Sequence, residues 1–455
     1  MRVRNCRLRG SMFVAALITL ALLQASCFPP QNITPERRRA DSIRASILRV
    51  TDIRIHGASG VASPPILRLP VDNRPGTGIG DDALTLEFEM QCDGIPNVTL
   101  ELIHCDQNWV PTENVFVQDP TVLRGNDFTV ARAPVGVTHY DYMLSTTFPR
   151  PGYRPQVQYA GNYIARIVDY YNLHHVLAEC RFFAVETRAS MGMQIYSDFY
   201  ESAQTKVLQN GWKIRVDAVP ENTLFGGTIL GTHLYQSGQW YAPLIADQEH
   251  QSEGEEKGAP WVTWSPTILG KTTAVFGNIA GGNEHRLLDL TDVGQYPTTG
   301  NVLTTALSDI PRMRFVEYDN NGIPPDRLVA LSDADYVEFQ FRLDLQGKRT
   351  SSDIFVVGTF NNWIPSPEWQ LQYDRITGFY MVRGLLRRAL HEYQYVAGKW
   401  DADHNVLREA DATLLEGNPR DASQAYYAFL YYHDNTAGGF DKIVGVAYGL
   451  STNIR

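Results

Sequence analysis

Short stretches of alternating apolar and polar residues recur along most of the chain, and this two-residue period limits the fold more than any other feature. Leu84–Gln91, Val98–Cys105 and Tyr336–Leu343 all alternate in this way. Successive side chains of a strand point to opposite faces, so each stretch predicts a strand with one buried face. No segment before Ala410 sustains the 3.6-residue period of a capped helix. The sequence therefore predicts an all-β fold.

The strand stretches fall into three groups, as expected for 455 residues at about 100–200 residues per domain. They predict tandem immunoglobulin-like or E-set β-sandwiches: an N-terminal one over 49–187, a middle β domain over 188–330 and a C-terminal E-set-like one over 331–455. Asp93-Gly94 between Leu84–Gln91 and Val98–Cys105 predicts a hairpin. Gly161, two residues before Tyr163, predicts a tyrosine corner, in which the phenol hydrogen-bonds to backbone.

The first segment predicts export. Four arginines within residues 2–9 precede an apolar run that is too short to span a bilayer, which is typical of a signal peptide. Ala25 and Ser26 lie directly before Cys27, the pattern of lipoprotein processing. We expect residues 1–26 to be removed, Cys27 to carry the lipid and 27–48 to form a tether. Ordinary cleavage nearby is the alternative.

Charge and cysteine content narrow the function classes. The formal net charge is -10, and removal of the signal leaves 36 basic against 50 acidic residues, or -14. This acidity argues against nucleic-acid binding. Cys92, Cys105 and Cys180 lie in apolar strand stretches, which favours small buried side chains, and their odd number leaves at least one thiol unpaired. A Cys105–Cys180 disulfide stays open as an alternative.

The candidate catalytic and metal-binding residues do not converge. His104 and Cys105 are adjacent on a strand and point to opposite faces, so they cannot act as a dyad. His174-His175 fails as a chelating pair for the same reason. Asp401-Ala402-Asp403-His404 lacks the glycine and distal glutamate of a calcium loop. We therefore predict no enzymatic activity, no metal and no cofactor, with an unrecognised hydrolase as the outlying alternative.

One stretch resembles a carbohydrate-binding module. Gly358-Thr359-Phe360-Asn361-Asn362-Trp363 and Tyr393–Trp400 are similar to the glycogen- and starch-binding β-sandwich family. In that family two tryptophans stack on sugars, which would implicate Trp363, Trp400 and the neighbouring Lys399. The alternative, which we favour, is a fold signature in which Phe360 and Trp363 pack a strand-to-turn crossover.

A broader resemblance runs from about residue 50 to the end. Seven stretches agree in order and spacing with a Bacteroidetes-type family of exported proteins, formerly of unknown function, that is associated with the plug of the type IX secretion translocon. The stretches are Ser63–Leu69, Leu102–Trp109, Thr138-His139-Tyr140 with Phe148-Pro149, Gly161-Asn162-Tyr163, Val207–Trp212, Gly281–Arg286 and Phe360–Trp363.

This resemblance implies a plug-type domain over 49–187 followed by further β domains. It also implies a non-enzymatic subunit that occludes the periplasmic opening of the outer-membrane β-barrel translocon. We accordingly expect a lipid-anchored protein at the periplasmic face of the outer membrane, with that barrel as partner. The alternative is a lipid-anchored glycan-binding protein using the C-terminal domain.

Overall fold

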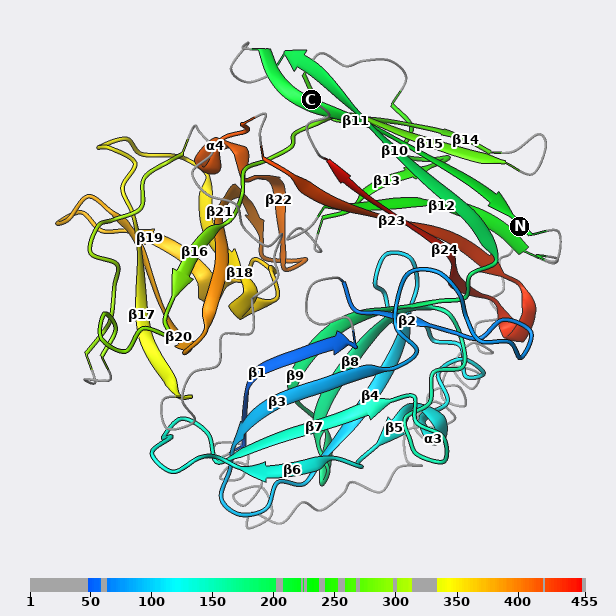
Figure 1. Cartoon of the computed structure of the whole chain (residues 1–455), viewed down its shortest axis with the longest axis horizontal. Helices are drawn as coiled ribbons and strands as arrows, with labels where there is room; N and C mark the ends of the chain where they lie inside the picture. The colour runs from blue at the N-terminus through cyan, green and yellow to red at the C-terminus, as the bar shows by residue number, and fades with distance from the viewer. Residues whose placement is uncertain are drawn as a thin grey trace, which may run out of the picture. The chain divides into compact units, whose positions relative to one another are not determined.

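The computed structural model describes residues 48–451 except 59–63, 202–207, 222–223, 225–226, 237–241, 253–257, 267–270, 298–300, 313–333 and 420–421. The expected signal peptide, Cys27 and the tether up to Ile47 lie outside the described residues. The described residues form an all-β body (Figure 1). Its described α-helices, α3 (Pro120–Leu123) and α4 (Thr413–Glu416), have four residues each. Three 3-10 turns accompany them: η2 (Thr359–Asn361), η3 (Pro367–Trp369) and η4 (Thr436–Gly438).

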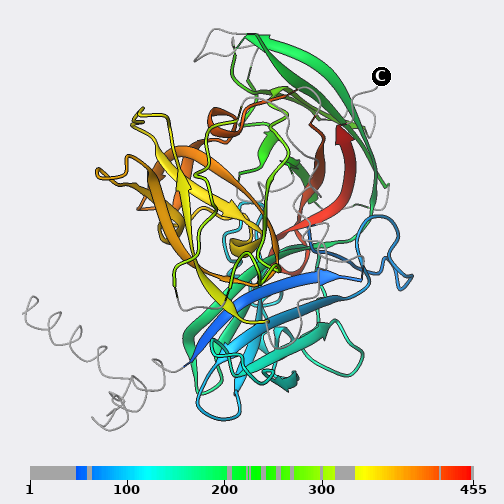
Figure 2. The same cartoon turned by 60° about the vertical axis from the view of Figure 1, so that its left-hand side comes forward.

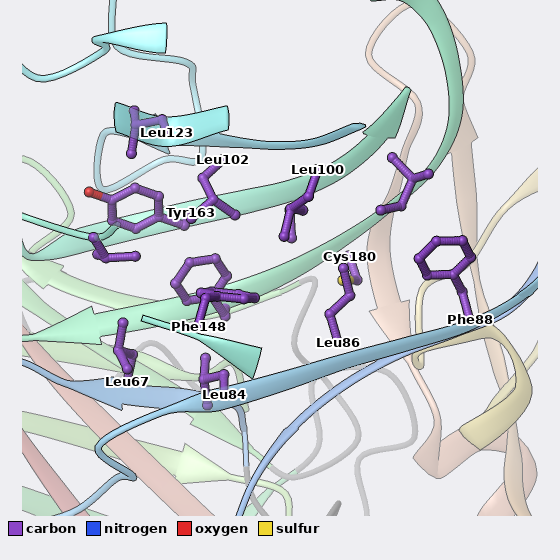
Figure 3. Packing of buried hydrophobic residues seen from close by; sticks show 14 of the residues in the cluster. Leu67, Leu84, Leu86, Phe88, Leu100, Leu102, Leu123, Phe148, Tyr163 and Cys180 are labelled. Atoms are coloured by element: carbon purple, nitrogen blue, oxygen red, sulfur yellow. The ribbon is translucent and has the colours of Figure 1, made fainter. Parts of the chain in front are cut away.

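The first sandwich consists of two sheets that pack face to face. One is a four-stranded sheet in the order β1-β3-β7-β6, and the other is part of a nine-stranded sheet. Buried leucine, phenylalanine and tyrosine side chains from both layers meet between them (Figure 3). Phe88 and Leu86 come from one layer, while Leu100 and Tyr163 come from the other. The strands are β1 (Arg49–Gly57), β2 (Ile66–Arg68), β3 (Leu84–Gln91), β4 (Val98–Cys105), β5 (Arg124–Gly125), β6 (Thr129–Arg132), β7 (Tyr142–Phe148), β8 (Gly161–Asp169) and β9 (Asn172–Val185).

The predicted hairpin of β3 and β4 does not form. Both strands have the expected bounds, but β3 pairs with β1 and β7, whereas β4 pairs with β8 and β5 in the opposite sheet. The turn at Asp93-Gly94 therefore crosses between layers. The two strands bury their apolar faces against each other across the core, and this satisfies the same alternation without pairing them. The expected tyrosine-corner hydrogen bond is present, because Tyr163 Oη donates to the Tyr159 carbonyl at 2.9 Å.

The middle sandwich is completed by the end of the chain. One layer is a four-stranded sheet in the order β10-β11-β15-β14, and the facing layer combines β13 and β12 with β23 and β24. Figure 2 shows the red C-terminal strands beside the green ones. The strands are β10 (Ala189–Glu201), β11 (Leu208–Pro220), β12 (Gly227–Gln236), β13 (Leu244–Asp247), β14 (Trp261–Ser265), β15 (Thr272–Ile279), β23 (Gln424–Asp434) and β24 (Phe440–Ser451).

Along the sequence, the third unit is inserted between the two parts of the middle sandwich, β10–β15 and β23–β24. Its seven-stranded sheet includes β16, which precedes the expected boundary at 330 and pairs with β21. The strand pairing therefore does not follow the predicted 188–330 and 331–455 division, since β16 belongs to the third sheet and β23 and β24 to the middle sandwich. The strands are β16 (Arg286–Asp289), β17 (Tyr336–Leu343), β18 (Asp353–Gly358), β19 (Gln370–Tyr373), β20 (Tyr380–Arg387), β21 (Leu390–Asp401) and β22 (Val406–Asp411).

Candidate functional site

The residues predicted to stack on sugars do not form a platform. Trp363 is only 4% exposed, and its ring packs on His285 with the centroids 4.2 Å apart. Trp400 is half-buried against Phe355 in the same apolar cluster. The ammonium of Lys399 is exposed and pairs with Glu409 at 2.8 Å. A sugar ring cannot reach the face of Trp363, so the fold-signature interpretation of this stretch agrees with the geometry.

The His104-Cys105-Asp106 stretch is structural. His104 Nε2 lies 3.1 Å from the Ala160 carbonyl and Nδ1 lies 2.8 Å from Thr112 Oγ1, so both ring nitrogens have partners. Burial lowers the pKa of His104 to about 4. The Cys105 thiol is buried, which raises its pKa to about 12. A neutral histidine and a protonated thiol on opposite faces of β4 do not make a nucleophile and base.

The three internal cysteines are free and buried, so the Cys105–Cys180 disulfide is not formed. Cys105 lies opposite Asn162 on β8, whereas Cys180 lies opposite Ala165. This offset along β8 separates the two sulfurs. Burial raises the pKa of Cys92 to about 11 and raises that of Cys180 still further.

The candidate metal ligands are occupied by other partners or are not gathered. Asp401 accepts hydrogen bonds from the His404 ring and the Arg408 guanidinium, and the latter contact is the main reason that its pKa falls to about 2. His174 and His175 lie on the exposed start of β9. Among the residues that the structure describes, no three histidine, cysteine or acidic side chains gather as a metal site.

The loop after β4 joins the first sandwich to the middle one. The Asp106 carboxylate accepts hydrogen bonds from the Asn108 and Val110 amides and fixes a turn in which Trp109 has φ +65°. The indole Nε1 of Trp109 then donates to Tyr235 Oη on β12 at 3.3 Å. The sequence of this loop alone does not indicate that it joins two domains.

A second series of hydrogen bonds also joins the first sandwich to the middle one. Tyr431 Oη on β23 donates to Asn162 Oδ1 at 2.8 Å, and Asn162 Nδ2 donates to the Asp106 carbonyl at 2.8 Å. Tyr431 and Asn162 are both fully buried. The Tyr431 hydroxyl and the Asn162 side-chain amide are therefore paired inside the joint, and these bonds help to specify how the two sandwiches meet.

The Gly281–Arg286 stretch is likewise a buried joint. His285 Nδ1 lies 3.3 Å from Glu392 Oε2, and both side chains are inaccessible. Arg286 Nε donates to both carboxylate oxygens of Glu416 at 3.0 Å. Arg312 adds a second guanidinium on Glu416 at 2.7 Å. The acidic and basic side chains of these ion pairs are at most 13% exposed.

A set of exposed apolar and tyrosine side chains lies in and beside two neighbouring turns at one end of the first sandwich. We call it the hairpin-end patch: Ile95, Tyr170, Tyr171, Leu173 and Val176. Their exposed fractions are 82%, 45%, 65%, 39% and 40%. Ile95 lies in the turn between β3 and β4, and the others lie in the β8–β9 turn and at the start of β9. Exposed aromatic and apolar side chains that lie close together make a region a candidate for a contact site.

Two hydrogen bonds hold the two turns of the patch together. The Tyr170 amide donates to the Asn97 carbonyl at 3.3 Å, and Asn97 Nδ2 donates to Tyr171 Oη at 3.1 Å. The rings of Tyr170 and Tyr171 meet edge to face with centroids 5.3 Å apart. The patch is thus preformed, and a partner needs to order little of it on binding. The sequence carried a signal for it, since Ile95 and two tyrosines stand in turns where polar residues are usual.

The comparisons bear on the fold. No protein-family model matches the chain, and no curated protein does. Among solved structures, a hypothetical protein from Parabacteroides merdae ATCC 43184 is similar, with 15% sequence identity and a TM-score of 0.66. The match covers 89% of this chain and 97% of that chain, so the fold is shared along nearly its whole length. Among the described residues, no helix is long and apolar enough to cross a membrane.

Proposed function

We propose that this chain is a non-enzymatic plug subunit that closes the periplasmic opening of the type IX secretion outer-membrane β-barrel. The observation that carries the proposal is the hairpin-end patch, a preformed apolar surface on the domain that the sequence resemblance identifies as plug-type. Lipid on Cys27 would hold the subunit at the periplasmic face of the outer membrane. The sandwiches would belong to the immunoglobulin-like and E-set classes.

The joints between sandwiches support this role. An idle pore wide enough for folded cargo needs a body that resists deformation. Hydrogen bonds from Trp109 to Tyr235 and from Tyr431 to Asn162 tie the first sandwich to the middle one. The contact between Tyr336 and Glu89 ties it to the third. A stopper whose parts are joined by buried hydrogen bonds keeps its shape under load.

Site-specific photocrosslinking tests the proposal. A photoreactive phenylalanine analogue at Tyr171 or Ile95 should crosslink the full-length chain to a very large outer-membrane β-barrel in intact cells. The matched control is Ile376, which is 95% exposed in the turn between β19 and β20 of the third unit. No barrel adduct from either patch position, or equal adducts from Ile376, would contradict the proposed docking surface.

A further inference from the structure

Strand β10 presents a long main-chain edge that no described strand covers. All 13 of its residues pair with β11 in one continuous register. The sheet order β10-β11-β15-β14 leaves its other side without a described partner strand. The Glu221 amide donates to the Arg188 carbonyl at 2.7 Å, which fixes the alternation of the ladder. The main-chain groups of Met193, Ile195, Ser197 and other odd-numbered residues therefore point to the open side.

Edge strands are usually blunted by shortness, lysine, proline, a bulge or a cover. The edges of β1, β14 and β17 carry such protection, and β10 does not. The register of β1 shifts between Thr51 and Arg54. β14 has five residues and is flanked by Pro260 and Pro266. Leu303 covers β17 by bonding the Glu338 carbonyl and the Gln340 amide. β10 contains no lysine, arginine or proline and has no register shift.

The inner face of β10 continues past the strands that cover it. Met191, Met193 and Ile195 pack toward Gly445 and Gly449 of β24. Further along the same face, Phe199 is 52% exposed, and Leu208 on the paired strand is 68% exposed. A strand added at this edge would bring its own alternate side chains onto that face and cover Phe199.

The charge on β10 indicates which side chains a strand added at this edge would carry. Asp198 lies on the solvent face near the distal end of β10, the same face as Tyr196, and forms no ion pair with a described lysine or arginine. A second copy of this chain would bring another carboxylate and no cation from its β10 to the edge. A strand with basic side chains on its solvent face would neutralise Asp198 instead.

We propose that the open edge of β10 takes up an extended strand from a different polypeptide, with apolar side chains on the inner face alternating with basic side chains on the solvent face beside Asp198. The main chain would give affinity through hydrogen bonds, and the alternate side chains would give selectivity. This inference does not depend on the plug role or on the hairpin-end patch.

The test uses the full-length chain and two labelled synthetic nine-residue peptides, one alternating valine with lysine and one alternating valine with glutamate. Fluorescence anisotropy should show saturable binding of the lysine peptide, and at least tenfold weaker binding of the glutamate peptide. Ser197→Pro removes an outward amide and blocks the edge, so it should weaken the lysine peptide at least tenfold. Tyr196→Ser, on the solvent face with the edge intact, should bind as the native chain does.

Two further readouts keep the proposal falsifiable. Asp198→Lys should reverse the preference between the two peptides, which serves if Ser197→Pro fails to fold. Equal binding of both peptides, or native binding by a folded Ser197→Pro variant, would overturn the proposal. A native dimer that Ser197→Pro converts to a monomer would also overturn it, because a second copy would then be the occupant. Crosslinking from Tyr171 should be unchanged in Ser197→Pro, which separates this test from that of the plug role.

Discussion

The phenol of Tyr336 donates a 2.5 Å hydrogen bond to Glu89 Oε2, linking β17 of the third unit to β3 of the first sandwich. Glu89 is 1% exposed, and Arg387 Nε donates to its other oxygen at 2.8 Å. Burial is the main reason that the pKa of Glu89 is raised, and the Arg387 charge opposes this effect. This buried carboxylate with its two donors is thus one of the contacts that hold the two units together.

Removal of Arg387 should loosen this joint. Arg387→Ala leaves a buried carboxylate without its counter-charge, which we expect to lower the free energy of unfolding by about 3–5 kcal/mol at pH 7. Part of this loss should be recovered as the pH falls, since protonation neutralises Glu89. The control is Arg383→Ala, an exposed position on the same strand, with a change within about 0.5 kcal/mol. Urea unfolding measures both variants, and equal losses would show that the ion pair is not what holds the joint.

His233 predicts a stabilising substitution. Its ring is fully buried, and neither ring nitrogen has a hydrogen-bond partner among the described residues. Because the ring packs on Tyr431, with centroids 4.4 Å apart, a phenylalanine keeps the contact and removes the unsatisfied groups. We expect His233→Phe to raise the free energy of unfolding by about 1 kcal/mol at pH 7.5. His404→Phe, on an exposed ring, should change little.

The same residue sets part of the acid sensitivity. Burial lowers the pKa of His233 to about 3, below the ordinary 6.5, so the unfolded chain binds the proton more readily. The stability that the neutral ring contributes is present above pH 6.5 and is lost as the pH falls toward 3. The advantage of His233→Phe over the native chain should therefore be larger at pH 4.5 than at pH 7.5. An advantage that shrinks on acidification would rule out this linkage.

Trp109 should matter through the joint that it makes. Trp109→Ala removes the indole that contacts Tyr235 and packs on Phe183, and we expect a loss of about 3 kcal/mol. Asn108→Ala, at the exposed neighbour, should cost under about 0.5 kcal/mol. Differential scanning calorimetry compares the two, and similar melting temperatures would argue that the indole contributes little to the joint.

Trp363 should contribute to the stability of the third unit, and the native chain should bind no α-glucan. Trp363→Ala empties a packed position beside His285, and we expect a loss of about 3–5 kcal/mol. Lys399→Ala, at an exposed ion pair, should cost at most about 1 kcal/mol. Calorimetry of the native chain with millimolar α-glucans should show no binding heat. Heat that Lys399→Ala abolishes would restore the glycan-binding interpretation.

The alternation in the sequence predicts strands well but not their partners. β3 and β4 have the expected bounds and lie in opposite sheets, since a two-residue period fixes which face is buried and leaves pairing open. The sequence also does not predict that β23 returns to the middle sandwich and pairs with β12. Its run Ala425–Tyr432 is apolar on both faces, which is typical of a strand inside a wide sheet and carries no information on its neighbours.

The candidate site was harder to predict than the fold. Trp363 and Trp400 match a binding pattern in sequence, yet local backbone geometry turns Trp363 inward. The hairpin-end patch depends on two turns that lie more than 70 residues apart and meet through Asn97 and Tyr171. A sequence shows that each turn contains apolar residues, but only the fold shows that the two turns meet.

The most direct test of the central claim is the leak of the outer membrane in cells that lack the gene. The account predicts that entry of a large fluorescent probe normally excluded by this membrane rises in the deletion strain. The native gene should restore the barrier, and a Tyr170→Ser, Tyr171→Ser double variant should not, although it is expressed and folded. An outer membrane as tight in the deletion strain as in the parent, with secretion unchanged, would contradict the plug role.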